Sequence, residues 1–480
     1  MNDESAVIGG SPPWARTLGL IVALGTACAL PLLFPGDAPF VNDEPALIKN
    51  ALIANHEHRL AQTGLTGSTG FPYGPLPTWI YQSFLLISHD LSVVVFLRAL
   101  LVILATAYSL AWLSRTLKLW PWFSIPVVLS PYIWFYARTL WDNSFCIPIS
   151  ALAFAAYLSF LVRESPASLA LSIASLWALV FTHLMSAALI VPIAVHVIIA
   201  RRKGLWRHKW VLLIVSAIAI GATRTYCSQL LHSFGGSGRH PSSAGWLFPL
   251  LSPRYLSASG LEYFFGSPAH LGLAGIAQWA ARASWSISLV AFPLVWVGII
   301  LAAASALQAV RRARFDIRSH AAILALAVLF TQMLLNWLTG TYGHPHYYNA
   351  TWIVYALFAW LTVDWLAGRA LATAVCGPYA AALATTILLL IASIHRSGGT
   401  REGYGPTLAN QMQIATELRQ YSATVPLDFK VLNYQKFPHA LETLRLLQPP
   451  PSGQPRQASR LSIVYSSTDA TNGRIQLIAD

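Results

Sequence analysis

Charged residues are scarce in this sequence: Asp, Glu, Lys and Arg together make up 10% of its 480 residues, against about 25% in ordinary soluble domains. Hydrophobic residues make up 55%, and the mean hydropathy is +0.54. Long apolar runs recur from Ala15 to His395, each near the ~20 residues that cross a bilayer as a helix. The runs do not alternate with polar residues, which excludes an outer-membrane β-barrel. The sequence therefore predicts an all-α polytopic membrane protein.

Cysteine is also rare. The four cysteines lie at scattered positions inside apolar runs, at Cys28, Cys146, Cys227 and Cys376. This spacing excludes a disulfide framework and a paired-cysteine metal site.

Acidic residues number 18 against 31 basic ones, and the net charge is +13. The basic residues collect in short connections between apolar runs, which is typical of cytoplasmic loops and argues against nucleic acid as a partner.

The apolar runs predict about eleven transmembrane helices, with interfacial helices in the first outer loop. Three basic connections, Arg115/Lys118, 201–209 and 311–318, belong on the cytoplasmic side, as does the N-terminus. The loops 35–90, 138–143, 231–284 and 339–349 then face outside. Residues 75–88 are apolar but short, so we expect them to lie in the outer interface. The expected spans are 16–34, 91–113, 121–137, 144–162, 167–182, 184–200, 210–230, 285–309, 319–338, 350–367 and 376–395.

The C-terminal tail differs in composition from the rest. We expect a transmembrane domain over residues 1–395 and a small extracytoplasmic α/β domain over residues 396–480. Two or three strands and a helix are indicated in the tail, together with a Pro-rich linker at 448–457. The segments that indicate them are 429–434, 441–447, 460–466 and 474–480.

Three acidic residues lie on the expected outer face near the bilayer. Asp43 and Glu44 occur in "FVNDEPALIKN", and Asp142 occurs in "YARTLWDNSF". Pro45 favours a helix start that Asn42 or Asp43 could cap, and Asp142 also stands before an expected helix. Because acids are so few in this chain, a catalytic role on this face is the alternative, and one carboxylate can serve both purposes.

Three arginines lie in or beside expected spans on the same side. Arg98 lies within the span 91–113, Arg224 lies near the outer end of the span 210–230, and Arg138 neighbours Asp142. An arginine in a membrane is costly and normally pairs or faces a polar cavity. These residues either snorkel to helix ends or form a pocket for a phosphate, whose oxygens guanidinium groups bind bidentately.

The turn "TGTYGHPHYYNATW" (339–352) is rich in histidine and aromatic residues. His344 and His346 could ligate zinc, but a zinc site needs three or four ligands, so we expect no metal. Tyr347 and Tyr348 suit an interfacial aromatic belt or a stacking surface for a sugar. A P-loop and a dinucleotide-binding fingerprint are both missing from the sequence.

In this order, the features resemble the C-type glycosyltransferases that take sugars from polyprenyl-phosphate carriers. The superfamily includes the aminoarabinose transferases of lipid A and the protein O-mannosyltransferases. The resemblance rests on Asp43-Glu44 after the first span, "FPYGPLPTWIY" (71–81), Arg98 in a long span, and "LSPYIWFYARTLWDNSF" (129–145). It covers about the first 165 residues, and "GHPHYYNATW" (343–352) is loosely like the family's late outer loop.

The resemblance implies a multi-pass membrane enzyme of the cell envelope, with no metal or other cofactor. It would move a sugar, with inversion, from a polyprenyl-phosphate donor to a lipid, glycan or protein acceptor. Asp43 would be the general base, Glu44 would assist it, and Asp142 would orient the acceptor or the sugar. The donor phosphate would be bound by Arg224, Arg138 and Arg98, and the sugar or acceptor by His344, His346, Tyr347 and Tyr348.

The sequence departs from the family at one point. Aminoarabinose transferases carry Glu-Lys ahead of their paired prolines, whereas this chain has Tyr73-Gly74 before Pro75. The lysine that binds phosphate in those enzymes is missing. Phosphate recognition must therefore come from other cations, or the donor differs.

Three alternatives remain open at this level. An O-antigen ligase or polymerase-like transferase uses a pyrophosphate-linked glycan and relies on Arg and His of a large late outer loop. A lipid or solute transporter needs a polar pathway across the midplane, where the later spans carry few charges. An inactive relative could serve as a scaffold. The residues that keep the ligase-like alternative open are Arg239, His240, Arg254 and His270.

Overall fold

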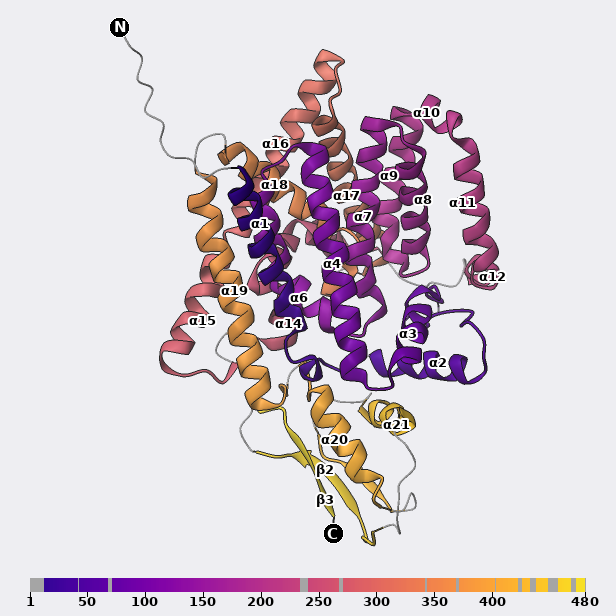
Figure 1. The fold of residues 1–480 in the computed structure, drawn as a ribbon, viewed down its shortest axis with the longest axis vertical. Helices are drawn as coiled ribbons and strands as arrows, with labels where there is room; N and C mark the ends of the chain where they lie inside the picture. Colours follow the sequence, from indigo (N-terminus) through magenta and orange to yellow (C-terminus); the bar gives the residue numbers. More distant parts are fainter. Residues whose placement is uncertain are drawn as a thin grey trace.

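The structure is a computed structural model in which most of the chain is described. The described residues are 13–41, 43–67, 71–233, 241–266, 271–341, 343–367, 371–401, 403–421, 425–431, 437–447, 456–467 and 472–479. Most of them are helical, and the principal helices stand side by side as an upright bundle (Figure 1). A small domain with three strands lies at one end of this bundle.

The upright bundle in Figure 1 includes the following helices. They are α1 (Pro13–Ala29), α4 (Leu91–Leu117), α7 (Cys146–Arg163), α8 (Pro166–Val180), α9 (Ala187–Ala200), α16 (Ala291–Arg312), α17 (Ile317–Thr339), α18 (Trp352–Ala367) and α19 (Ala372–Ser397). Beside them run α15 (Gly275–Ser288), α11 (Lys209–Ala222) and α12 (Arg224–Ser233). Short α10 (Arg202–Arg207), α13 (Ser243–Leu247) and α14 (Glu262–Phe265) connect them.

The expected apolar runs are helical, but the expected number of eleven spans is not established. Within the described residues, five helices are long and apolar enough to cross a membrane: Leu91–Leu117, Asp142–Arg163, Gly275–Arg312, Ile317–Thr339 and Ala372–Ser397. A sixth arises if the bent pair Lys209–Ala222 and Arg224–His232 is one span. Several other apolar helices are shorter, as expected for a bundle in which helices are broken near its ends. The protein is a multi-pass membrane protein.

Two expected spans are wrong as single straight helices. The segment 121–137 divides into α5 (Ser124–Val128) and α6 (Pro131–Arg138), because Pro131 cannot donate a backbone hydrogen bond and favours extended backbone at Ser130. The segment 210–230 bends by 81° between α11 and α12. At that bend the Thr223 hydroxyl donates to the Ala219 carbonyl at 2.7 Å, an interaction that often bends helices.

The first loop forms two short helices at the lower end of the bundle, α2 (Glu44–His56) and α3 (Leu76–Ile87) (Figure 1). They pack against each other, and the side-chain amide of Gln82 on α3 donates to Asn55 of α2 at 3.0 Å. A helix of α3's 12 residues is about 18 Å long, whereas the hydrocarbon core is about 30 Å thick. Its length therefore favours the expected position in the interface.

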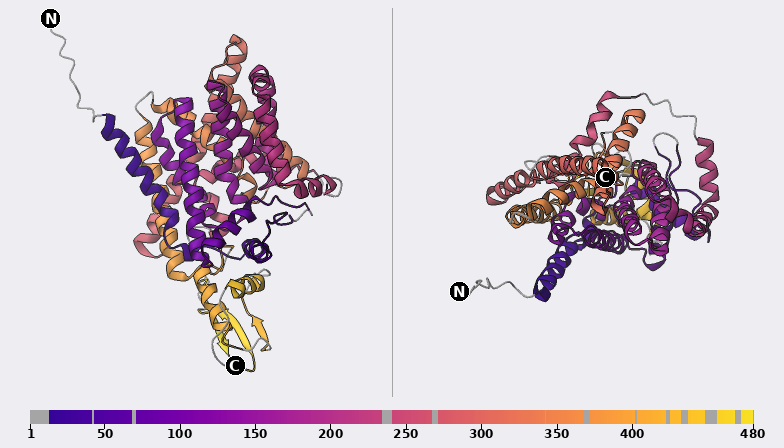
Figure 2. Two further views of the ribbon diagram at one scale, coloured as in Figure 1. Left: turned by 45° about the vertical axis from the view of Figure 1, so that its right-hand side comes forward. Right: turned by 90° about the horizontal axis from the view of Figure 1, so that it is seen from above.

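The C-terminal domain contains α20 (Leu408–Leu418), α21 (Phe437–Leu447) and the strands β1 (Leu427–Phe429), β2 (Leu461–Tyr465) and β3 (Ile475–Ala479). β2 pairs in parallel with β1 and antiparallel with β3. Of the expected elements, 441–447 belongs to α21, and the first strand lies slightly earlier than 429–434. Residues 432–436, and 448–455 of the expected linker, lie outside the described part of the chain. Figure 2 shows the domain beyond the end of the bundle that carries α2 and α3.

The C-terminal domain and α2 share one hydrophobic core. Leu47 and Ile48 of α2 are buried in the same cluster as Leu441 and Leu444 of α21 and Ile414 of α20. At the edge of this contact, the Lys49 ammonium lies 2.7 Å from the Glu442 carboxylate. The hydroxyl of Thr443 lies 3.2 Å from the Pro45 carbonyl. The start of α2 is therefore held by residues from the other end of the chain.

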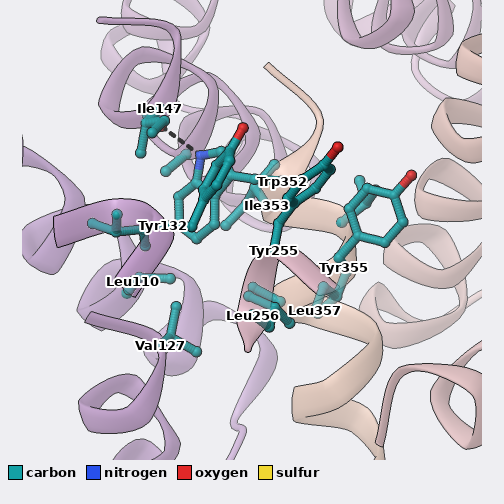
Figure 3. Packing of buried hydrophobic residues seen from close by; sticks show 14 of the residues in the cluster. Leu110, Val127, Tyr132, Ile147, Tyr255, Leu256, Trp352, Ile353, Tyr355 and Leu357 are labelled. Carbon is teal, nitrogen blue, oxygen red and sulfur yellow. Dashed lines mark hydrogen bonds between the residues drawn. The ribbon is translucent and has the colours of Figure 1, made fainter. Parts of the chain in front are cut away.

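An aromatic core behind the outer turns joins α6, α7 and α18. Figure 3 shows Tyr132, Tyr255 and Trp352 packed together, with the Trp352 indole pointing to Ile147. Nε1 of Trp352 donates to the Ile147 carbonyl at 3.0 Å, and the Tyr132 hydroxyl donates to the Pro345 carbonyl at 2.8 Å. These buried contacts fix the turn before α18 against the turn before α7, so both turns are rigid.

Candidate active site

Asp43 stands at the entrance to α2. It occupies the residue before the helix, and Pro45 is at the second helical position, so the local sequence favours a helix start here. The Asp43 side chain does not cap this helix. One of its oxygens, Oδ2, instead accepts a hydrogen bond from Nε1 of Trp141 at 3.2 Å. The capping role is thus not observed, and the half-buried carboxylate faces the turn before α7. Asn42 lies outside the described residues.

Histidine and aromatic rings from three turns surround Trp141. The ring of His346 is 4.7 Å from the Trp141 indole, and the ring of Tyr347 is 4.3 Å from His346, centroid to centroid. His183, in the turn after α8, lies 6.4 Å from His346 and 4.5 Å from Tyr73 by the same measure. Segments far apart in sequence therefore form one aromatic wall beside Asp43.

The two inner histidines of this wall are neutral at physiological pH. Burial lowers the pKa of His183 to about 4, although the Asp43 carboxylate opposes the shift. Burial, with His183 and His344 nearby, also lowers the pKa of His346 well below its usual range. Nδ1 of His183 accepts from the Met185 amide at 3.3 Å, so the neutral ring carries its proton on Nε2. These imidazoles can donate or accept single hydrogen bonds but do not supply positive charge.

Asp142 and Glu44 lie deeper than Asp43. Both are almost fully buried, at 2% and 1% exposure, and Asp142 is close enough to interact electrostatically with both Asp43 and Glu44. Oδ1 of Asp142 accepts from the Asn143 amide at 2.7 Å, while the buried Oδ2 has no hydrogen-bond partner among the described residues. Three carboxylates are thus concentrated at one place, which is costly for stability and typical of a functional site.

Arg98 is a buried cation near Glu44, one of these acids. It is fully buried, its Nη1 donates to the Tyr136 carbonyl, and its guanidinium lies 5.2 Å from the centre of the Phe145 ring. It interacts electrostatically with Glu44 and with Tyr81. The structure therefore places Arg98 behind the carboxylates, where its positive charge offsets theirs.

Arg138 lies on the far side of the same turn. Its guanidinium donates to the carbonyls of Leu33 and Phe34, the latter at 2.7 Å, and lies 5.1 Å from the Trp134 ring centre. It is only 2% exposed. Because these contacts are with the end of the first helical segment, Arg138 fastens α6 to that segment.

Arg224 differs from the other two arginines because its side chain is exposed. It is the first residue of α12, directly after the 81° bend. Two residues later, the Tyr226 hydroxyl donates to the Val180 carbonyl at 3.1 Å. This bond holds the start of α12 at the end of α8, from which the His183 turn begins.

The late turn contributes residues of two kinds. His346 and Tyr347 are half-buried and face the wall, and His344, which stacks on His346 at 5.5 Å, is exposed. Tyr348 is fully buried, and its hydroxyl accepts from Asn336 at 2.8 Å. Of the four residues expected to bind sugar or acceptor, Tyr348 thus supports the turn from behind.

Several residues of the site were not among those predicted from the sequence. Trp141 and His183 contact predicted residues, Tyr73 contacts His183, and Asn349 bridges two turns by donating to Oδ1 of Asn143 at 3.0 Å. Trp141 stands next to Asp142 in sequence, which was a usable signal. Tyr73 and His183 also lie in loops expected on the outer face, but the sequence does not show that they meet, because more than a hundred residues separate them.

The departure at Tyr73-Gly74 has a structural reason. A Cβ atom on Gly74 would lie 2.2 Å from the Phe181 backbone, closer than any side chain tolerates. The Leu76 amide also donates to the Phe181 carbonyl at 3.2 Å. No lysine can occupy position 74 in this packing, so the family's phosphate-binding lysine has no equivalent there.

Two further possibilities from the sequence are a metal site and a ligase-like site, and only some of their residues are among those that the structure describes. No group of three or more His, Cys, Asp and Glu residues suited to a metal occurs in the part of the chain that the structure describes. Arg254 of the ligase-like alternative lies 5.0 and 5.1 Å from the ring centres of Phe248 and Tyr255. Arg239, His240 and His270 lie outside the described residues.

Comparison with known proteins identifies the fold. No protein-family model and no curated protein sequence matches the chain. The crystal structure of ArnT from Cupriavidus metallidurans bound to undecaprenyl phosphate superposes with a TM-score of 0.53 at 13% identity, over 95% of this chain and 94% of that one. Its apo state gives 0.52 at 13% identity, over 89% and 85%. The chain has the fold of a C-type glycosyltransferase, as the resemblance in its sequence predicted.

Archaeal oligosaccharyltransferase AglB from Archaeoglobus fulgidus, in complex with an inhibitory peptide and a dolichol-phosphate, is a weaker match. Its TM-score is 0.49 at 14% identity, over 90% of this chain and 64% of that one.

Proposed function

We propose that this protein is a membrane glycosyltransferase that moves a sugar from a polyprenyl-phosphate donor to an acceptor hydroxyl or amine. The observation that carries the proposal is the position of Asp43, beside Trp141 and the two neutral histidines, on an ArnT-like fold. ArnT itself has been crystallised with undecaprenyl phosphate, which supports a carrier of that chemical class here.

Asp43 is the general base in this proposal. The acceptor's oxygen or nitrogen attacks the anomeric carbon while Asp43 takes its proton, and the bond from that carbon to the phosphate oxygen breaks. The polyprenyl phosphate leaves with the bonding electrons, and a single displacement inverts the anomeric centre. A positioned general base is worth about 10²–10⁴-fold in rate. The hydrogen bond from Trp141 directs the Asp43 carboxylate.

The deeper carboxylates set the surroundings of Asp43. Glu44 is buried and interacts electrostatically with Arg98, which keeps the local charge tolerable. Asp142 has one oxygen without a partner in the described residues, which can accept a hydrogen bond from the acceptor or from a sugar hydroxyl. The rings of Tyr73, His346 and Tyr347 give the sugar an apolar face to stack on.

The leaving phosphate needs preorganised positive charge. We assign this role to Arg224, which is exposed at the start of α12, close to the His183 turn. Arg98 and Arg138 donate to backbone carbonyls from buried positions, so they act on the donor through the turns that they hold. Gly74 leaves no space for a lysine, so the binding of the phosphate depends all the more on Arg224.

In the membrane, we place the N-terminus on the cytoplasmic side and the C-terminal domain outside. The basic connections at the opposite end from α2 support this orientation. The partners are then the lipid-linked donor and a lipid, glycan or protein acceptor at the outer surface. The proposed reaction uses no metal or other cofactor.

The test is transfer of a radiolabelled sugar from a panel of polyprenyl-phosphate sugars, in membranes containing the wild type, Asp43→Asn or Asp90→Asn. Asp90 caps α4 by accepting from the Ser92 amide at 2.8 Å, and asparagine caps equally well. We expect transfer with the wild type and Asp90→Asn and at least a hundredfold loss with Asp43→Asn. Transfer that survives Asp43→Asn but is lost in Arg254→Ala would favour the ligase-like mechanism instead.

A further inference from the structure

A cavity outside the candidate site lies between α8, α9 and α11. Its volume is about 320 Å³, within the range of pockets that hold small ligands. The wall is almost wholly apolar, with Ile173, Ile193 and Leu212 among its residues. On α8 the lining extends from Leu169 to Val180, or about 16 Å at the helical rise. This shape and chemistry fit a hydrocarbon chain that lies along α8.

One end of the cavity carries polar groups. Tyr157 of α7 lines it, and the Tyr157 hydroxyl contacts Nδ1 of His196 at 2.5 Å. Nε2 of His196 lies 3.3 Å from Nδ1 of His320 on α17. Arg201, directly after α9, interacts electrostatically with Tyr157 and with His320. A guanidinium therefore stands beside the polar end of an apolar cavity.

Arg201 is only partly satisfied by the protein. Its Nη2 donates to the Leu161 carbonyl at 2.9 Å, while its buried Nε has no hydrogen-bond partner among the described residues. Arg202 and Lys203, the next two residues, are exposed. The nearby Glu164 is paired with Arg207 at 3.2 Å. The segment Arg201–Lys203, between the lining residues Ile198 and Leu205, forms the rim of the cavity, and its three basic residues suit an anionic headgroup.

This rim lies at the end of the bundle opposite the candidate site. Figure 1 shows α10, which follows Arg201, at the opposite end from α2 and α3. α11 contributes Leu212 and Ser216 to the cavity wall, and none of its described residues is buried. A ligand in the cavity would fill the space between α11 and its neighbours α8 and α9.

We propose that the cavity holds one acyl chain of an anionic phospholipid, drawn from the leaflet opposite the candidate site, with the lipid phosphate bound by Arg201. Guanidinium and phosphate form charge-assisted hydrogen bonds, and the acyl chain gains the free energy of apolar burial. The donor's polyprenyl chain fits less well, since its phosphate must lie at the candidate site, far from Arg201. The proposal does not depend on the proposed transferase activity.

The first experiment uses the wild-type protein in nanodiscs of phosphatidylcholine with about 30 mol% phosphatidylglycerol. A phosphatidylglycerol with a photoreactive acyl chain is activated, and the labelled peptides are mapped by mass spectrometry. We expect labelling of α8, α9 and α11 at cavity-lining residues such as Ile173, Ile193 and Leu212. Excess unlabelled phosphatidylglycerol should compete, and excess phosphatidylcholine should compete at least fivefold less well.

The second experiment compares Arg201→Gln with Arg115→Gln. Arg115 is exposed in the last turn of α4 and does not line the cavity, so it controls for loss of one basic residue. Native mass spectrometry should show at least fivefold less retained phosphatidylglycerol in Arg201→Gln and no change in Arg115→Gln. Equal retention by the two variants would overturn the role of Arg201.

If Arg201→Gln does not fold, the wild-type labelling decides alone. Competition by undecaprenyl phosphate, stronger than that by phosphatidylglycerol, would assign the cavity to a polyprenyl chain and overturn the proposal. Labelling spread evenly over all lipid-facing helices would show that no specific site exists.

Discussion

The indole nitrogen of Trp141 lies 3.2 Å from Oδ2 of Asp43. The two residues are 98 positions apart in the chain, and one precedes α2 while the other precedes the turn into α7. Their contact joins the first outer loop to the bundle at the proposed reaction centre. Each of the predictions below depends on this junction or on the groups beside it.

Trp141→Phe should retain the ring and remove the donated hydrogen bond. A hydrogen bond to a charged group is worth about 1.5–3 kcal/mol, so we expect kcat/KM for sugar transfer to fall about ten- to hundredfold. The matched control is Trp79→Phe, because Nε1 of Trp79 donates to the Ala61 carbonyl at 2.8 Å, away from the carboxylates. A smaller loss in Trp141→Phe than in Trp79→Phe would contradict a positioning role for the indole.

Asp142→Asn should leave the fold at least as stable as the wild type and lower transfer at least tenfold. Burial, with Asp43 and Glu44 nearby, raises the pKa of Asp142 to about 7, so the substitution removes a carboxyl whose ionisation is unfavourable here and also removes the acceptor oxygen that we assign to the substrate. Thermal unfolding and initial transfer rates measure the two effects.

Asp364→Asn is the control for Asp142→Asn, with the opposite expected pattern. Asp364 pairs with Arg318 at 2.8 Å and accepts from the Trp120 amide at 3.0 Å, at the other end of the bundle. The Asp364→Asn variant should be less stable than the wild type and should retain its specific activity. The role of Asp142 in binding the substrate would be refuted if the Asp142→Asn variant unfolded more readily than Asp364→Asn and transferred sugar at the normal rate.

Acid should destabilise the site through His183. Its pKa is held at about 4 in the folded protein, whereas an unfolded histidine titrates near 6.5. The unfolded state therefore binds more protons between these values, so the stabilisation is complete above about pH 6.5 and is lost as the pH falls toward 4. The full effect is on the order of 3 kcal/mol. Thermal unfolding between pH 7.5 and pH 4.5 should show a steeper decline in the wild type than in His183→Gln, and parallel curves would contradict it.

Gly74→Ala should disrupt the contact between the first loop and the turn after α8. The added Cβ would lie 2.2 Å from backbone atoms of Phe181, so the loop must move and carry Tyr73 away from His183. We expect at least a tenfold loss of transfer and a lower unfolding temperature. Gly343→Ala, also next to the site, has nothing within 4 Å of its added Cβ and should be tolerated. Equal behaviour of the two variants would show that the close approach is unimportant.

The membrane class and the helical runs could be predicted from the sequence because apolar length is a local property. Asp43, Glu44 and Asp142 could be predicted as a group because acids are rare and all three precede expected helices. The helix breaks at Pro131 and Thr223 were not predicted, since the hydropathy of an apolar run is the same whether or not the helix bends within it. Pro131 itself was visible, and its effect on Ser130 follows from elementary sterics.

The roles of the arginines could not be predicted in the same way. Arg98, Arg138 and Arg224 look alike in sequence, yet the structure buries two of them against backbone carbonyls and leaves the third exposed. Burial depends on which helices pack together, and that is fixed by contacts far apart in the chain. The contacts of His183 could not be predicted for the same reason, because its neighbours Tyr73 and His346 come from other segments.

The shared core of α2 and α21 has a consequence for biosynthesis. Pro45 and Thr443 are 398 residues apart, so Asp43 leaves the ribosome early, but the contacts that hold the start of α2 cannot form until α21 has been made. Domains generally fold as they are synthesised, and contacts this distant in sequence form slowly. Chains that stop before α21 would therefore contain the helices of the bundle and still lack the contacts that hold the start of α2. The synthesis of α21 would act as the step that fixes the position of Asp43.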